Sequence, residues 1–171
     1  MVFAGSLASK PSPANIGSIL NRITTGYNLQ ASQLFDNRFI WGYRHLYSGI
    51  WHALNAKKND RMISKTLTIE VLLYVAGQRQ IKKAFTIGVK ETTQEVVGVL
   101  LGEVDQNLIK ANLQLQKKLD LTPDLNLLDD FSSKNQYMIK KLMDDGYPAS
   151  DFTFSEIEKA ILQKIALLAL E

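Results

Sequence analysis

A helical pattern that runs almost without a break through residues 34–89 most constrains what this 171-residue chain can fold into. Apolar residues recur there at intervals of three and four, as in helices that bury one face. We expect Asp36 to cap a helix that reaches about Lys58, and Gly77 and Gly88 to end two shorter helices. The first helix carries a broad apolar stripe rich in aromatic residues, which predicts core packing more than base stacking. This stripe consists of Phe39, Ile40, Tyr43, Leu46, Tyr47, Ile50, Trp51 and Leu54.

The flanking segments predict a sheet and the helices that cover it. Runs of strand-forming residues predict strands over residues 2–8, 29–35, 93–101 and 125–128, the last of these at an edge. Amphipathic patterns predict helices over residues 13–25, 104–118 and 132–146, and from Thr153 onwards. We therefore expect a single domain, residues 1–171, of the α/β (α+β) class. It should contain a small mixed central sheet of about four to five strands, flanked by six to seven helices.

Composition and motifs argue against an enzyme. The chain has no cysteine, which excludes disulfides, thiolate metal sites and cysteine nucleophiles. His45 and His52 share a helix face, but their spacing places them about 10 Å apart along the axis, too far for one metal ion. The doublet Asp144-Asp145 is expected to be a solvated cap, and no phosphate-binding loop or nucleophile elbow is found. We therefore expect a binding protein without catalytic residues, metal or cofactor.

Nothing in the sequence predicts export or membrane insertion. The N-terminus lacks a basic lead-in followed by a long apolar run, so no secretory signal is expected. The most apolar stretches, residues 69–77 and 165–170, are too short to span a bilayer. The expectation is a soluble, cytoplasmic protein that makes no membrane contact.

Charge is distributed unevenly along the chain, although the net charge is only +3. Residues 57–90 hold eight basic and two acidic residues, whereas residues 91–171 hold eight basic and fourteen acidic residues. A basic middle followed by an acidic end suggests that one face of the protein binds a polyanion and that another face does not. The alternative is a solvated helical hairpin that happens to be rich in lysine.

The break between the two shorter helices, residues 77–81, offers the groups that an unpaired RNA end requires. Such an end presents phosphates and unstacked bases, so its site needs cations, an amide for base edges and an apolar surface. Gly77 would allow close backbone approach, and Arg79 would bind phosphate or stack on a base. Gln80 would read a base edge, and Ile81 would support one. Further basic residues would extend the track towards the acceptor stem, namely Lys82, Lys83, Lys57, Lys58, Arg61 and Lys65.

The same break has a simpler interpretation. An ordinary helix corner would leave Arg79 and Gln80 solvated and would bury Ile81 in the core. Residue spacing alone does not decide between the two interpretations.

Six residues within the segment 68–89 form a fairly specific pattern, consisting of Glu70, Gly77, Arg79, Gln80, Ile81 and Gly88. This segment resembles the small kinase-binding subunit of the KEOPS complex, in its archaeal form. The similarity extends to residues 92–101 and to the alanine- and leucine-rich last helix, residues 158–170. Gly49 stands where a small alanine-like residue is expected, and residues 122–135 match nothing in the family.

The resemblance implies a compact α/β partner protein that has no catalytic activity. Family members bind the N-terminal lobe of the small atypical kinase of the complex. They are similar in gripping the 3′ end of tRNA as well, which they deliver to the subunit that makes threonylcarbamoyladenosine. The partners implied for this chain are therefore that kinase and the tRNA 3′ end.

The last helix is the kinase contact that we expect. Its final turns, residues 165–170, are apolar almost all the way round, so this end is either wholly buried or docks against something. One part of the helix should pack on the sheet and another part should meet the kinase, with Ile161, Ile165 and Leu168 as contact residues. Two other functions stay open, namely an adaptor that binds protein and no RNA, and a small-molecule-binding or hydrolytic α/β domain.

Overall fold

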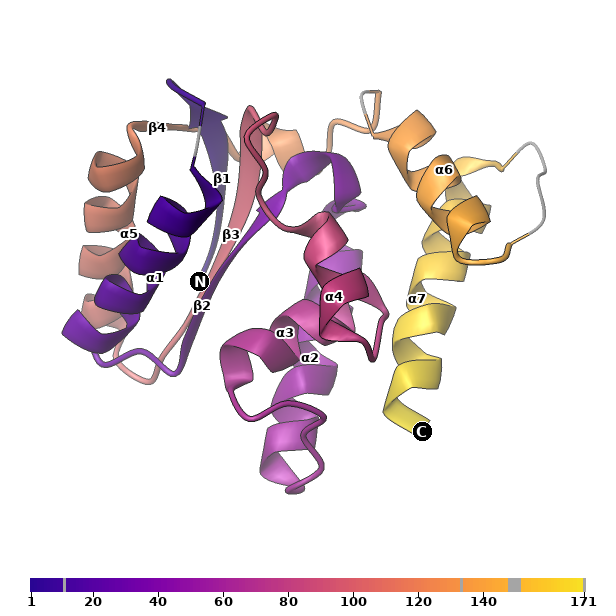
Figure 1. Ribbon diagram of the computed structural model, residues 1–171, viewed down its shortest axis with the longest axis horizontal. Coiled ribbons are helices and arrows are strands. Elements are labelled where there is room, and N and C mark those ends of the chain that lie inside the picture. Colours follow the sequence, from indigo (N-terminus) through magenta and orange to yellow (C-terminus); the bar gives the residue numbers. More distant parts are fainter. Residues whose placement is uncertain (11, 133, 148–151, 171) are drawn as a thin grey trace.

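A sheet of four strands in the order β2–β3–β1–β4 runs through the computed structural model (Figure 1). The structure describes residues 1–10, 12–132, 134–147 and 152–170. Each of the pairings is antiparallel, and Gly98 of β3 lies opposite Phe3 of β1 on one side and opposite Leu34 of β2 on the other. The strands are β1 (Val2–Leu7), β2 (Ala31–Asp36), β3 (Glu95–Leu101) and β4 (Leu121–Pro123).

Helices cover both faces of this sheet. In Figure 1, α1 and α5 lie on one side of the strands, and α2, α3 and α7 lie on the other. The α-helices in the described ranges are α1 (Pro13–Gly26), α2 (Gly42–Lys58), α3 (Leu67–Ala76), α4 (Ile81–Ala84), α5 (Asp105–Leu119), α6 (Asn135–Asp144) and α7 (Phe154–Leu170). Three short 3-10 helices join them, η1 (Asn37–Phe39), η2 (Phe85–Ile87) and η3 (Leu125–Leu128).

The predicted α+β class is confirmed, as are a four-stranded sheet and the expected number of helices in the described part of the chain. The sheet is antiparallel throughout these strands, whereas a mixed sheet was expected. One strand prediction is wrong, because residues 125–128 form η3 and the edge strand lies just before them, at β4. The Asp124 carboxylate accepts a hydrogen bond from the N–H of Asn126 at 3.0 Å. This side-chain bond favours a turn over continued strand pairing.

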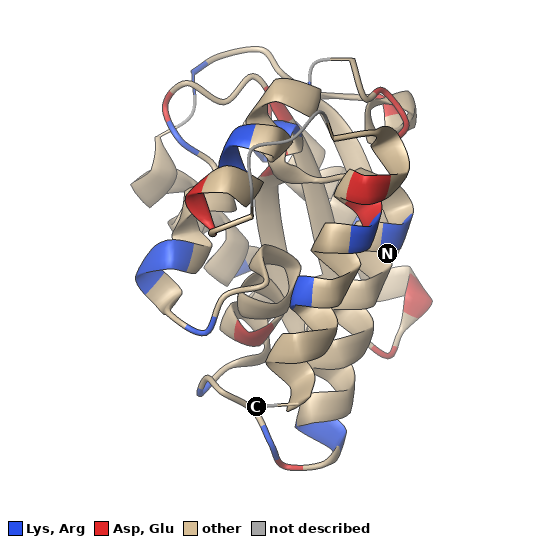
Figure 2. Ribbon diagram, turned by 90° about the vertical axis from the view of Figure 1, so that its right-hand side faces the viewer, with Lys and Arg blue, Asp and Glu red and all other residues tan. Residues whose placement is uncertain are grey.

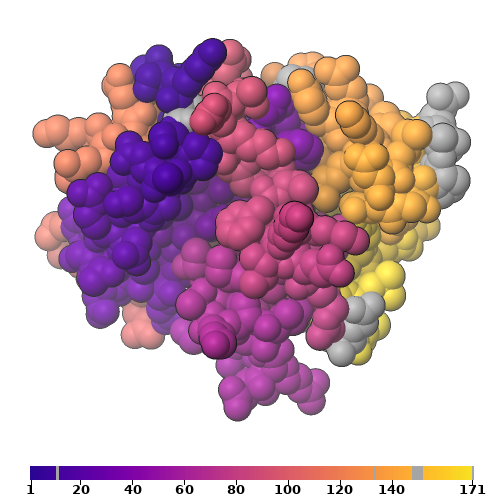
Figure 3. Space-filling view, in the orientation of Figure 1, coloured from indigo at the N-terminus to yellow at the C-terminus, as the bar shows by residue number. Residues whose placement is uncertain are grey.

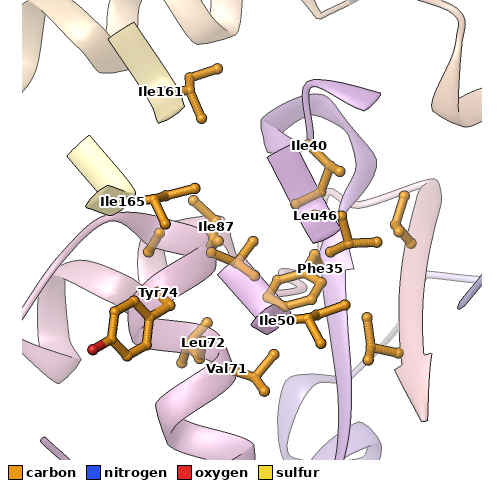
Figure 4. Close-up of a cluster of buried hydrophobic side chains, with 14 of the residues drawn as sticks. Phe35, Ile40, Leu46, Ile50, Val71, Leu72, Tyr74, Ile87, Ile161 and Ile165 are labelled. Atoms are coloured by element: carbon orange, nitrogen blue, oxygen red, sulfur yellow. The ribbon is translucent and has the colours of Figure 1, made fainter. Parts of the chain in front are cut away.

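The larger of two hydrophobic cores lies between the sheet and the layer of α2, α3 and α7. Figure 4 shows Phe35 of β2, Ile50 of α2 and Val71 of α3 gathered in this core. The second core lies between the other face of the sheet and helices α1 and α5. Two cores on opposite faces of one sheet are the packing that the amphipathic helices require.

Gly49 lies where α2 crosses α3. A Cβ atom added there would lie 2.8 Å from Cα and 2.9 Å from the backbone nitrogen of Val75. Real Cβ atoms do not approach backbone atoms this closely, so even an alanine would push the two helices apart. The departure of Gly49 from the resemblance therefore has a packing reason.

The helix that contains the aromatic stripe begins later than predicted. Asp36 caps the short η1 helix, where its carboxylate accepts from the N–H of Arg38 at 3.1 Å. The chain is extended at Ile40, and α2 begins at Gly42. The imidazole of His45 then accepts a hydrogen bond from the N–H of Trp41 at 3.0 Å, at the start of the helix.

The prediction that the whole aromatic stripe is core is wrong. Leu46 and Ile50 are buried, but Tyr47 and Trp51 are each 61% exposed. Tyr43 and Leu54 are exposed as well. The stripe is wider than the face of α2 that the core can cover, so half of it lies on the surface.

Candidate functional site

The corner between α3 and α4 is held by its backbone. Gly77 follows the last residue of α3 and has φ +59° and ψ 42°, as the predicted helix end requires. Its N–H donates to the carbonyl of Tyr74, and the N–H of Gln78 donates to the carbonyl of Leu73, both at 3.0 Å. This pair of bonds is the Schellman arrangement, which ends a helix and turns the chain sharply.

The corner is exposed, and it brings together the residues that were predicted to act as a unit. Arg79, Gln80, Lys82 and Lys83 are exposed, and Ile81 is 46% exposed rather than buried in the core. A cavity of about 320 Å³ lies beside the corner. It is lined by Gly77, Gln78, Arg79, Gln80 and Lys83, together with Lys164, Leu167 and Leu168 of α7.

The second group of predicted basic residues is only partly joined to this corner. Arg61 lines a cavity of about 390 Å³ that Arg79 also lines, so these two residues lie at one site. Lys57, Lys58 and Lys65 are exposed, but they line neither cavity. The structure therefore connects Arg61 to the corner through a shared cavity and leaves the three lysines outside both cavities.

This second cavity has an aromatic wall that the sequence interpretation missed. The rings of His52 and Tyr74 are stacked, with centroids 5.8 Å apart and planes 15° apart, and both line the cavity. Partial burial lowers the pKa of His52, which favours a neutral, stacking imidazole. The sequence suggests for His52 only a role as a metal ligand beside His45. Its stacking partner Tyr74 lies on another helix, α3, so the spacing of residues within α2 does not reveal the pair.

Hydrogen bonds through Asp145, at the end of α6, tie the corner to α6 and α7. Gln78 donates from Nε2 to Asp145 at 2.8 Å, and the other oxygen of Asp145 accepts from Lys164 and from Lys141. Burial lowers the pKa of Lys164, while its bond to Asp145 opposes that shift. Asp145 is therefore not the solvated cap that was predicted, because its carboxylate joins α6 and α7 to Gln78 of the corner.

The loop before α3 is anchored by a buried carboxylate. Glu70 is fully buried, and it accepts hydrogen bonds from the N–H of Ile63 at 2.9 Å and from the N–H of Ser64 at 2.8 Å. The hydroxyl of Ser64 donates to it as well. Since three donors converge on it, Glu70 fixes the path of the loop that carries Arg61.

The predicted partner residues on α7 face inwards. Ile161, Ile165 and Leu168 are all buried, and they belong to the larger core of this chain. Figure 4 shows Ile161 and Ile165 directed at that core. They are therefore unavailable to a partner in this structure, and a contact made by α7 has to use its outer side.

The outer side of α7 adjoins α2 at Arg44. A shallow cavity of about 470 Å³ between the two helices is lined by residues that include Arg44, Leu162 and Ala166. Arg44 pairs with Glu158 across this boundary at 2.9 Å. Leu167 and Leu170 are exposed towards the end of α7. Figure 2 shows this side of the molecule, where charged residues gather near the start of α7 and are absent from its last turns, residues 165–170.

Neither a metal site nor a membrane span appears among the residues that the structure describes. No group of three or more His, Cys, Asp or Glu side chains lies close enough together there to hold a metal ion. Within the same ranges, no helix combines the length and apolarity that a bilayer crossing needs.

A family model matches the sequence. The model of the family described as "Kinase binding protein CGI-121" matches residues 14–169, which is nearly the whole chain. A comparison with curated proteins finds no match.

Proposed function

The chain belongs to the CGI-121 family of kinase-binding proteins, and from this premise we propose that it is the non-catalytic KEOPS subunit that binds the small atypical kinase and recruits tRNA. In this role it holds the single-stranded 3′ end of the tRNA during formation of threonylcarbamoyladenosine. The proposal includes a cytoplasmic, archaeal setting. The family match supports the kinase partner, and the exposed corner at Gly77 supports the RNA partner.

The kinase would dock on the surface formed by the exposed half of the α2 stripe and the outer side of α7. We call this the α2–α7 surface, and it consists of Tyr43, Tyr47, Trp51, Leu54, Leu162, Ala166 and Leu170. Exposed aromatic residues close together are typical of protein interfaces, where tryptophan and tyrosine are enriched among the few residues that dominate binding. The N-terminal lobe of the kinase is the part that this surface would contact.

Charge substitution on this surface tests the kinase contact. The variant Tyr47→Glu/Trp51→Glu should lose about 30-fold or more in affinity for the kinase subunit, because two interface anchors are replaced by carboxylates. The control is Ile109→Glu/Leu113→Glu on α5, where both residues are similarly exposed on the opposite side of the sheet. Equal kinase affinity of both folded variants, measured by biolayer interferometry, would remove the α2–α7 surface from the proposal.

The RNA contact rests on one observation, the exposure of Arg79, Gln80, Ile81 and Lys82 together at a tight helix corner. Cations, an amide and an apolar side chain are the groups that hold unstacked nucleotides. Arg61 lies close enough to line a cavity with Arg79, which extends the basic surface beyond the corner. The tRNA tail would pass over this corner, with its phosphates towards the basic residues.

A charge reversal at the corner tests this contact. The variant Arg79→Glu/Lys82→Glu should abolish tRNA binding in a gel shift and leave the fold intact, since both residues are exposed. Wild-type protein should show an equal loss with tRNA that lacks its single-stranded 3′ end. Each phosphate contact removed should also flatten the dependence of log K on log salt by about 0.7. The control Lys110→Glu/Lys117→Glu places the same charge change on α5.

The second candidate is an adaptor that binds the kinase and no RNA. It is favoured by the α2–α7 surface, which needs only a protein partner. Under this alternative, the corner variant binds the kinase normally and wild-type protein retains no bulk tRNA at moderate salt.

A further inference from the structure

A fourth cavity, of about 570 Å³, lies between α6 and the segment of residues 81–92. Residues 81–92 meet the α6 segment on the face of the molecule shown in Figure 3. The cavity is lined by Gln78 and Lys83, which also line the cavity at the corner. It extends well beyond them, to Arg38 in η1, to Lys90 and to Lys140 in α6. Its volume lies in the range of cavities that hold small ligands.

The lining of this cavity is strongly basic. Five basic side chains line it, Arg38, Lys83, Lys90, Lys140 and Lys141, against two acidic ones, Asp144 and Asp145. Figure 2 shows that basic residues of α4 and α6 lie on the same side of the molecule. Lys83 and Lys90 lie in the segment of residues 81–92 and Lys140 lies in α6, so the fold, and not a local run of lysines, brings Lys140 to the other two.

Internal ion pairs account for only part of this positive charge. Arg38 pairs with Asp36, and Lys141 pairs with Asp145, which Lys164 also contacts. Among the described residues, Lys83, Lys90 and Lys140 have no carboxylate at ion-pair distance. Asp144 is the one remaining acid on the wall, so the lining keeps an excess of positive charge. Lys83 also contributes to the lowering of the pKa of Lys164, after burial and Lys141.

One wall of the cavity is rigid. Arg38 donates from Nε to Asp36 at 2.9 Å and also makes a second bond to that carboxylate. Asp36 is buried and accepts from the hydroxyl of Thr93 at 2.8 Å. Such paired hydrogen bonds fix a guanidinium in one orientation, so this wall is ordered before a ligand arrives.

Cationic side chains of the protein already lie over the aromatic rings of the cavity. The guanidinium of Arg38 lies 4.9 Å from the centre of the Tyr137 ring, and the ammonium of Lys90 lies 5.7 Å from that of Phe39. Cations on these faces compete with a stacked base. Recognition here would therefore depend on phosphate oxygens and very little on the identity of a base.

We propose that this cavity is a phosphate-binding site for a nucleotide ligand, with Lys83, Lys90 and Lys140 donating to the phosphate oxygens. The phosphates come from one of two sources. A free nucleotide would occupy the cavity alone, whereas an RNA tail would reach it across Gln78 and Lys83 from the corner. Only the second source rests on the function proposed above.

The test uses a charge reversal that leaves the corner unchanged. Lys90→Glu/Lys140→Glu is compared with the control Lys110→Glu/Lys117→Glu, in which all substituted lysines are likewise exposed. The probes are ATP and pyrophosphate in isothermal titration calorimetry, and a labelled single-stranded tRNA tail in fluorescence polarisation. The cavity variant should lose about tenfold or more in affinity for whichever probe binds wild type, because two charge-assisted hydrogen bonds are lost. The control should change by less than about twofold.

The outcomes either assign the phosphates to a free nucleotide or to RNA, or overturn the proposal. Loss of ATP and pyrophosphate binding in the cavity variant identifies a free anion as the ligand, and similar affinities for the two probes confirm that the base is not recognised. If wild type binds neither probe, weaker binding of the RNA tail to the cavity variant assigns the phosphates to RNA. Unchanged affinity of the cavity variant for every probe that wild type binds overturns the proposal, as does binding of no probe at all. Failure of the proposed function can be told apart from failure of the cavity proposal. In that case the corner variant Arg79→Glu/Lys82→Glu would keep the RNA affinity of wild type.

Discussion

Acidification should destabilise the protein through His45, and a His45→Gln variant should lose less stability over the same pH range. His45 is buried, and its Nδ1 accepts from the N–H of Trp41 at 3.0 Å. Its Nε2 therefore carries the proton and donates to the carbonyl of Val75 at 2.8 Å. The imidazole thus bridges the start of α2 and the end of α3 in its neutral form.

Burial lowers the pKa of His45 from 6.5 to about 4, against the opposing effect of the Val75 carbonyl. As the pH falls below about 6.5, the unfolded chain binds a proton that the folded chain excludes, so the free energy of unfolding decreases. The slope approaches about 1.4 kcal/mol per pH unit and vanishes below about pH 4, where both states are protonated. Between pH 7 and pH 4.5 the loss from this one group is about 2 kcal/mol.

Urea unfolding of wild type and His45→Gln at several pH values between 7 and 4.5 measures this loss. Glutamine also offers one donor and one acceptor, but it does not titrate. Carboxylate titrations are common to both proteins, so the difference between their pH profiles isolates His45. Profiles that stay parallel to within about 0.5 kcal/mol would refute the reasoning, given the usual error of such extrapolations. A histidine NMR signal from this position that titrates near its ordinary pKa would do so independently.

Two further predictions concern packing and loop anchoring. Gly49→Ala should lower the free energy of unfolding by about 1–3 kcal/mol, because its Cβ would collide with the backbone of Val75. Gly17→Ala on the exposed side of α1, where nothing lies within 4 Å of the added atom, should instead gain up to about 1 kcal/mol from helix propensity. Equal effects at the two sites in urea unfolding would contradict the close crossing of α2 and α3. Glu70→Gln should cost about 1–3 kcal/mol, since an amide oxygen cannot serve three donors. It should also speed tryptic cleavage in the preceding loop, and unchanged cleavage would mean that the carboxylate does not anchor that loop.

The parts of the fold that depend on local rules were predictable from the sequence. The β-branched run of β3 and the amphipathic pattern of α5 gave elements close to those observed. Gly77 was expected to end α3, and its left-handed conformation does so. The corner residues that follow it were expected to act together because they are adjacent in the chain. Neighbours along a chain remain neighbours in any fold, so such a cluster requires no knowledge of packing.

The burial of each helix face and the contacts between distant segments were decided by the tertiary structure alone. An apolar stripe shows that a helix has a side to bury, but its width does not reveal how much its neighbours cover, so Tyr47 and Trp51 were wrongly expected in the core. The apolar pattern of α7 likewise does not show which of its sides is covered. Ile165 was therefore expected in an interface, but it packs in the core. Asp145, which bonds to the corner, and the lysines of the basic 570 Å³ cavity come from segments far apart in sequence. Their meeting depends on how the helices pack, and packing is a property of the whole chain.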